Sequence, residues 1–206
     1  TVAVQPSVLR WARESLGMSV PDVANRLKRP AAEIERWESG DAAPTYAQLE
    51  KLAYSVYKRP LAVFFLPEPP RELQPQREFR TLPEADLDTL SRDTHLQIRR
   101  AHAYQLALGE LFEGGNPAPR RIWQVLSLSL SRSIARQAEE IRDILRIDME
   151  TQAGWSSDER ALKAWRTAIE DVGVFVFKNA FKQKDISGFC LTDAEFPLIY
   201  LNNSTT

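Results

Sequence analysis

The chain has 206 residues, of which 43% are hydrophobic and 27% are charged, with 27 Lys and Arg against 28 Asp and Glu. This composition is typical of a soluble globular protein with one large or two small domains. The longest apolar run, Leu61–Leu66, is too short to cross a bilayer, no signal-peptide pattern opens the chain, and the single cysteine, Cys190, excludes an intrachain disulfide. We therefore expect a cytoplasmic protein with no membrane partner.

Residues 6–58 show the spacing of a compact helix-turn-helix module. Ser19, with Asp22 three residues further on, predicts a capping box at the start of a helix. Gly40 predicts a helix end, and Thr45 predicts the cap of a fourth helix. We expect four or five short helices around one small core. The apolar residues at helical spacing are Leu9, Ala12, Leu16, Val20, Val23, Ala24, Leu27, Ile34, Trp37, Leu49, Leu52 and Ala53.

This region resembles the XRE family of helix-turn-helix domains, the Cro/lambda-repressor type. The resemblance implies that double-stranded DNA is the partner. It also implies that the second helix of the motif, which is the third helix of the module, lies in the major groove. It also implies a salt bridge between Arg13 and Glu38 that stabilises the module whatever its ligand. The residues that carry the resemblance are Leu16–Ser19, Val23-Ala24, Ile34–Gly40, Pro44-Thr45, Leu49, Leu52 and Ala53.

The family uses a polar residue at the start of the second helix to hold phosphate, and long polar side chains on the third helix to read bases. Here those positions hold Val20, Ala31 and Ala32, so Glu33 and Arg36 are the longer candidates for the groove. The candidate DNA-binding residues are Ser19, Lys28, Arg29, Ala31, Ala32, Glu33 and Arg36.

The charge of the module keeps a second interpretation open. Residues 1–60 contain nine Lys and Arg against seven Asp and Glu, a net charge of only +2, whereas dedicated DNA-binding domains are usually strongly basic. The alternative is a protein-interaction or dimerisation module without sequence-specific DNA binding. Its partner would be a second copy of the chain or a repressor protein.

The domain boundaries follow from proline content. We predict a helix-turn-helix domain over residues 1–66, with Leu61–Leu66 folding back on the fourth helix. Residues 67–75 contain four prolines and cannot hold a helix, so residues 67–83 are predicted to form a Pro-rich linker. Residues 84–206 form the remaining part.

That remaining part is predicted to begin with helices and to end with strands. A long helical pattern covers residues 85–112, and further helices are expected from Ser131 or Ser133 to Leu145 and over Ser157–Val172. Strands are expected at residues 174–177, 186–191 and 197–202. The predicted fold class is therefore mainly α, then α+β: a four- or five-helix domain, a linker, a helical segment and a short three-stranded sheet.

Catalytic motifs are absent from the sequence. His95 and His102 lie seven residues apart on one predicted helix without other metal-ligand residue types at suitable spacing, so we expect two helix histidines and no metal site. No nucleophile elbow and no phosphate-binding glycine loop occurs. We predict no catalytic, cofactor-binding or metal-binding residue in these 206 residues.

A second resemblance covers the carboxyl-terminal part. This part is similar to the ImmA/IrrE metallopeptidase family. The segments that carry the resemblance are residues 161–166, 173–177, 186–191 and 196–202, together with Pro60–Pro67. The resemblance implies a following helix with a His-Glu-x-x-His zinc site and, in the full-length form, cleavage of a repressor protein.

The sequence ends at Thr206, before the point where that helix would begin. We therefore expect the chain to be the amino-terminal part of a longer protein or a truncation, and to be inactive as a peptidase. Zinc is expected only if the catalytic helix exists. Three apolar strands without a following helix predict a sheet face that is exposed or needs a partner.

Overall fold

The protein is described here by a computed structural model that covers residues 1–71 and 90–204. These form two compact units, Thr1–Arg99 with Phe181–Gln183, and Arg100–Ala180 with Lys184–Thr206. Helices come first and a three-stranded sheet comes last, which confirms the predicted fold class. Most of the predicted linker lies outside the described residues, and residues 67–71 form neither helix nor strand.

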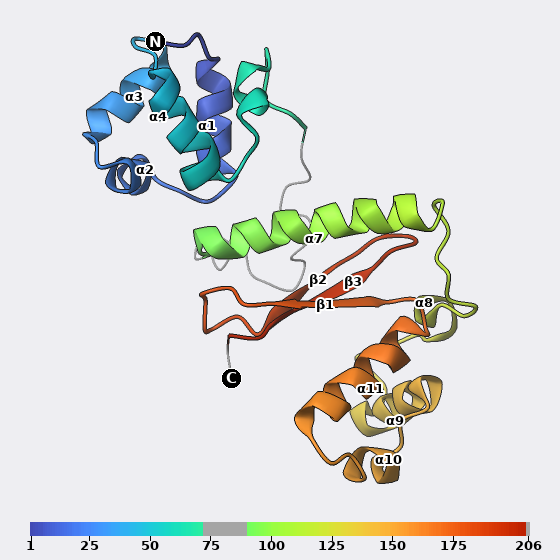
Figure 1. Ribbon diagram of the computed structural model, residues 1–206. Helices are drawn as coiled ribbons and strands as arrows, with labels where there is room; N and C mark the ends of the chain where they lie inside the picture. Colours follow the sequence, from blue (N-terminus) through green and yellow to red (C-terminus); the bar gives the residue numbers. More distant parts are fainter. Residues whose placement is uncertain (72–89, 205–206) are drawn as a thin grey trace. The chain divides into compact units, whose positions relative to one another are not determined.

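The helix-turn-helix region of the first unit consists of short helices around one apolar core (Figure 1). Its elements are α1 (Pro6–Glu14), α2 (Val20–Leu27), α3 (Ala31–Ser39) and α4 (Tyr46–Lys51), then the π-helical η1 (Leu52–Tyr57) and the 3-10 turn η2 (Leu61–Phe65). Of the predicted core residues only Val20 is not fully buried. The sequence patterns missed four further core residues, Val8, Met18, Val56 and Tyr57, whereas buried Phe64 belongs to the predicted tail.

Local side-chain signals set the ends of these helices. The Ser19 and Thr45 hydroxyl oxygens accept hydrogen bonds from the backbone N–H groups of Asp22 and Gln48, and both sites form complete capping boxes. Gly40 ends α3 with φ of 91°, a left-handed conformation that glycine adopts without strain. The residues predicted to delimit these helices therefore do so.

The apolar tail after α4 folds back as predicted. The Phe64 ring is fully buried and stacks on Tyr57 of η1, with ring centroids 5.9 Å apart. Because η1 continues α4 without a break, this contact places the tail against the extended fourth helix. Burying two aromatic rings together removes a large apolar area from water and stabilises the module.

The long helix α7 (Arg92–Leu111) starts later than the pattern over residues 85–112 predicts. Residues 90–91 are not helical, because the Ser91 hydroxyl oxygen accepts a hydrogen bond from the Thr94 N–H at 3.2 Å and so caps the helix. The predicted residues 85–89 lie outside the described ones. Both histidines lie on α7, as expected.

Four shorter helices follow α7 in the second unit. α9 (Ile134–Leu145) and α11 (Asp158–Glu170) lie within the predicted ranges, whereas α8 (Ile122–Val125) and α10 (Met149–Ala153) were not predicted. Ser157 caps α11 through its hydroxyl, which accepts from the Arg160 N–H. Ser133 occupies the position before α9, but its side chain makes no capping bond.

The sheet consists of β1 (Phe175–Asn179), β2 (Gly188–Leu191) and β3 (Leu198–Asn202) in the order β1-β3-β2. β3 pairs parallel with β1 and antiparallel with β2. The α7 residue Tyr104 packs on Phe177 and Tyr200, at centroid distances of 4.5 and 6.2 Å, so this helix covers one face of the sheet (Figure 1). Cys190 of β2 is exposed, whereas its neighbours Phe189 and Leu191 are buried.

Among the helices that the structure describes, none is both long enough and apolar enough to span a membrane.

Candidate nucleic-acid interface

The two helices of the motif, α2 and α3, are joined by a three-residue turn. Lys28 ends α2 in a left-handed conformation with φ of 56°, and the Arg29 N–H donates to the Ala24 carbonyl at 3.0 Å. Pro30 comes directly before α3, one position earlier than a first-turn proline would be. The turn leaves the side chains of Lys28 and Arg29 exposed beside the start of α3.

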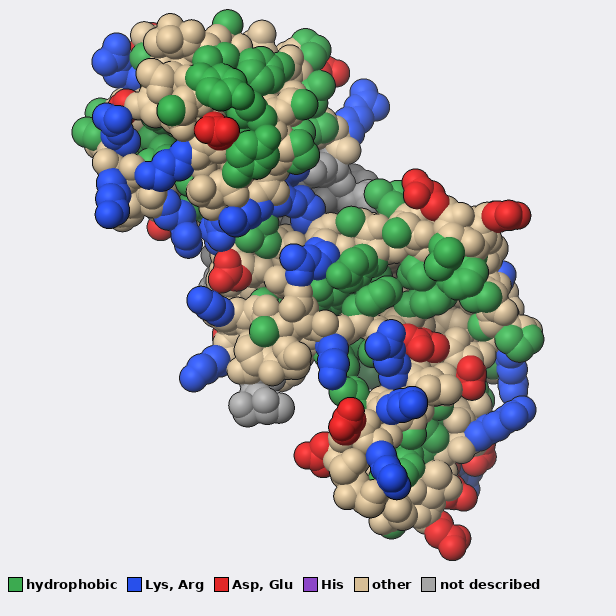
Figure 2. Space-filling model, in the orientation of Figure 1, with side chains coloured by type: hydrophobic (Ala, Val, Ile, Leu, Met, Phe, Trp, Pro, Cys, Tyr) green, Lys and Arg blue, Asp and Glu red, His purple; other side chains and the backbone are tan. Residues whose placement is uncertain are grey.

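One side of α3 faces the core and the other faces solvent. Ile34 and Trp37 are buried, whereas Ala32 and Arg36 are exposed and Ala31 is half-buried. Because residues three and four apart share a helix face, Ala32 and Arg36 form one exposed strip. Figure 2 shows Lys and Arg side chains gathered on the side of this unit where Figure 1 places α2 and α3.

The Glu33 carboxylate is occupied by neighbouring side chains. The Gln48 amide of α4 donates to Glu33 Oε1 at 3.0 Å, and Arg29 Nη1 lies 3.9 Å from Glu33 Oε2. Glu33 is half-buried. Its carboxylate links α3 to α4 and partly offsets the positive charge of Arg29. The sequence reasoning missed Gln48. Its place three residues after Thr45 predicts a capping-box residue, which it is, but gives no sign of the contact with Glu33.

Ser19 is exposed, and the fold itself uses its hydroxyl. Ser19 Oγ donates to Asp22 Oδ2 at 2.6 Å, and the Ser19 N–H donates to the same oxygen at 2.8 Å. These bonds to the ionised form lower the pKa of the Asp22 carboxyl. A phosphate contact by Ser19 would therefore compete with the capping box of α2.

Arg13 of α1 and Glu38 of α3 hold α3 on the module. Arg13 Nε and Nη2 donate to the two Glu38 carboxylate oxygens at 2.8 and 2.7 Å, and Arg13 Nη1 donates to the Met18 carbonyl at 2.9 Å. The bond to Glu38 raises the pKa of the Arg13 guanidinium. Arg10, which the sequence reasoning did not single out, adds a bond of 3.0 Å to the Glu38 carbonyl.

The comparison with protein families matches this region. A family model described as a helix-turn-helix domain matches residues 7–54, which run from the second residue of α1 into η1. The comparison with curated proteins and the comparison with solved structures give no match. The chain is thus similar to helix-turn-helix domains over its first helices, and this similarity suggests a DNA-binding regulator.

The described residues do not form a zinc site. Within residues 1–71 and 90–204, no group of three His, Cys, Asp or Glu side chains could hold a metal ion. The zinc ligands implied by the metallopeptidase resemblance are therefore not supplied by the described residues, and no reaction step through zinc follows from them.

Proposed function

We propose that the protein is a DNA-binding transcriptional regulator of the XRE type that places α3 in the major groove. The similarity of residues 7–54 to a helix-turn-helix domain is the observation that carries this proposal. The exposed strip of α3 starts with the small Ala32, and the half-buried Ala31 beside it is equally small, so the helix can approach base edges closely.

The residues take different roles in this proposal. Lys28 and Arg29, on the turn before α3, bind phosphates and set the position of the helix. Arg36 is the long side chain on the exposed strip that can donate two hydrogen bonds to guanine. Ala31 and Ala32 offer methyl groups to thymine, and Glu33 positions α3 through Gln48.

The test selects bound sequences from a random pool of duplex DNA with the whole protein, and then measures affinity at several salt concentrations. Replacing Arg36 with Ala should reduce discrimination between selected and unselected DNA by about tenfold. Replacing Lys28 with Ala should weaken binding to all sequences and lower the salt slope by about one. Arg136→Ala, on α9 of the second unit, is the control and should change neither value.

A protein-interaction module is the second candidate. The low net charge of the module and the neutralised Glu33–Arg29 pair favour it, as do exposed Tyr46, Tyr54 and Phe65. Under this function the pool yields no enriched sequence and Arg36→Ala leaves residual DNA binding unchanged. Sedimentation of the protein alone would detect pairing with a second copy, and sedimentation with a candidate repressor would detect that partner.

We also propose that the second unit is the leading part of an ImmA/IrrE-like metallopeptidase domain, whose full-length form cleaves a repressor. The succession of α11 and three strands supports this proposal, since the resemblance has that order before the zinc helix. The intact mass of the native protein, with the reading frame after Thr206, tests it. A frame that continues into His-Glu-x-x-His supports the proposal, and a frame that continues without this motif contradicts it.

A further inference from the structure

A hollow in the second unit is independent of the helix-turn-helix region. It lies between the end of α9, α10, α11 and the loop before α8, and its volume is about 710 Å³. Small-molecule sites in proteins commonly have volumes of this size.

The inner surface of the hollow is apolar. Leu145, Ile147 and Val172 are buried, and Trp155 is half-buried beside them. The Trp155 ring is held edge-on by Trp165, with centroids 6.0 Å apart and an interplanar angle of 79°. This part of the hollow therefore offers a fixed aromatic surface to a ligand.

The outer part of the hollow is cationic. Four basic side chains line it, against the single acidic side chain of Asp171. None of the four is in an ion pair with another described residue, and all four are exposed. They are Arg120, Arg146, Arg160 and Lys163.

The spacing along α11 explains why its residues gather here. Arg160, Lys163 and Thr167 recur every three or four residues, so they share one face with the small Ala164 and Ala168, and Asp171, which directly follows the helix, continues the same spacing. No residue of α11 is fully buried, and this face therefore has no tightly packed neighbour among the described residues.

Neighbouring bonds shape the hollow without using these four cations. Arg142 Nη1 donates to the Ile147 carbonyl at 3.3 Å and Arg142 Nη2 donates to Gln152 Oε1 at 2.7 Å, which fastens the α9–α10 turn. The Asp148 carboxylate caps α10 by accepting from the Thr151 N–H at 2.7 Å. The guanidinium of Arg142 is thus used by the fold, whereas that of Arg146 is available to a ligand.

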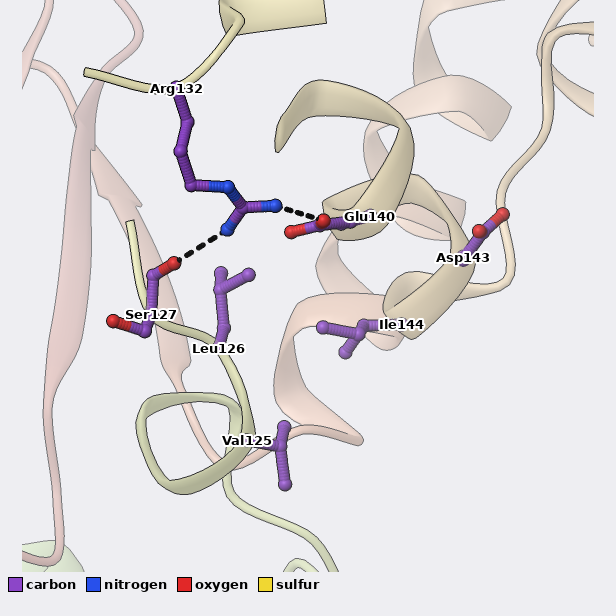
Figure 3. A pocket seen from close by; sticks show the side chains of 7 residues that line it. All are labelled: Val125, Leu126, Ser127, Arg132, Glu140, Asp143 and Ile144. Atoms are coloured by element: carbon purple, nitrogen blue, oxygen red, sulfur yellow. Dashed lines mark hydrogen bonds and ion pairs between the residues drawn. The ribbon is translucent and has the colours of Figure 1, made fainter. Parts of the chain in front are cut away.

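A second hollow nearby lacks this property. It has a volume of about 400 Å³, and its one basic side chain, Arg132, already bonds to the Ser127 carbonyl and pairs with Glu140 (Figure 3). Asp143 adds another negative charge there. An anion would therefore be repelled from the smaller hollow and attracted to the larger one.

We propose that the larger hollow binds an amphipathic organic anion, a small molecule with an aromatic or otherwise apolar body and a carboxylate, sulfonate or phosphate group. The body lies against Trp155 and Ile147, where it leaves water. The anionic group lies among Arg146, Arg160 and Lys163, whose cations attract it and can donate hydrogen bonds to its oxygens.

The experiment measures binding of the fluorescent probe anilinonaphthalene sulfonate to the whole protein, and of phenyl naphthylamine, which has a similar aromatic body and no charge. The native protein should bind one sulfonate probe per chain, at least about tenfold tighter than the neutral one. The triple variant Arg146→Gln, Arg160→Gln, Lys163→Gln should bind the sulfonate at least about tenfold more weakly and lose the preference.

The control variant removes three exposed charges elsewhere in the same unit, with Arg136→Gln, Lys178→Gln and Lys184→Gln, and should bind the sulfonate within about twofold of the native protein. A third variant, Ala168→Trp, should exclude both probes by filling the hollow. Circular dichroism and thermal melting establish that each variant is folded. The proposal is overturned if the native protein binds no sulfonate probe, if it binds both probes equally, or if the two triple variants behave alike.

Discussion

Arg13 and Glu38 show what one buried ion pair does for the module. The two side chains are only 13% and 6% exposed, so both charged groups are largely desolvated. That loss is offset because the contact is bidentate and because Arg13 also donates to the Met18 carbonyl. The pair fixes α1 against α3, and so sets the position of the helix that the proposed function places in DNA.

Replacing Arg13 with Met should lower the free energy of unfolding of the helix-turn-helix region by about 3 kcal/mol, because the buried Glu38 carboxylate would keep only the guanidinium of Arg10, whose Nε lies 3.9 Å away, as a partner. Urea unfolding followed by circular dichroism measures the change. Adding Glu38→Leu to Arg13→Met should restore most of the stability, since the uncompensated carboxylate is then gone. If the double variant were as unstable as the single one, packing of the arginine stem and not the pair of charges would be responsible.

Gly188 is a residue whose missing side chain matters. A Cβ atom added there would lie 2.6 Å from the Tyr200 carbonyl oxygen, which belongs to the neighbouring strand and cannot move independently. Replacing Gly188 with Ala should therefore destabilise the sheet by about 1–3 kcal/mol. Gly154→Ala is the matched control, because its added Cβ would meet backbone atoms only at 3.5 Å or more. Thermal melting of both variants should show a loss for the first alone.

At the scale of single helices, the capping box of α2 links stability to pH. The Asp22 carboxyl accepts two hydrogen bonds from Ser19, and its pKa is lowered from the ordinary 3.8. A group with a lowered pKa in the folded state contributes stability above the ordinary pKa and loses it as the pH falls through the folded value.

Asp22→Ala should therefore cost about 1 kcal/mol near neutral pH, and the difference from the native protein should shrink as the pH falls below 3.8. Unfolding by urea at a series of pH values measures both effects. Thr45→Ala, which removes the uncharged cap of α4, is the control and should lower the stability by a similar amount at every pH of the series. A difference that does not depend on pH would assign the effect to helix propensity alone.

The elements differ in how far the sequence predicts them, and the difference follows from the range of the interactions. Ser19, Thr45 and Gly40 act within four residues of themselves, so the ends of the helices near them were predicted. At the start of α9, by contrast, the apolar residues do not mark the buried side of the helix. Ile134 and Ala138 are exposed, whereas Gln137 is buried and bonds the Ser129 backbone N–H and carbonyl.

The sequence predicts the local features of the candidate interface but not its long-range contacts. Motif spacing places Lys28, Arg29 and Arg36 at the turn and on α3, and the structure leaves all three exposed. The contact between Glu33 and Gln48 joins residues 15 apart, and the strand order β1-β3-β2 joins segments still farther apart. No periodic pattern encodes such contacts, because they depend on how complete elements pack.

At the scale of the whole molecule, each unit has an apolar core of its own. The core of the helix-turn-helix region uses residues between Val8 and Phe64, and the sheet is packed by the aromatic residues Tyr104, Phe177 and Tyr200. Substitutions that are far apart and share no partner usually have additive effects on stability. We therefore expect Arg13→Met and Gly188→Ala to act on different units.

Hydrogen exchange followed by mass spectrometry resolves the two units within one protein. Arg13→Met should speed exchange in α1 to α4 and leave β1 to β3 unchanged, because it lowers only the free energy of opening the first core. Gly188→Ala should do the reverse, and the double variant should show the sum of the two patterns. Faster exchange in both regions after either single substitution would mean that the two cores unfold as one cooperative unit. The stability of the proposed DNA-binding unit would then depend on that of the proposed ligand-binding unit.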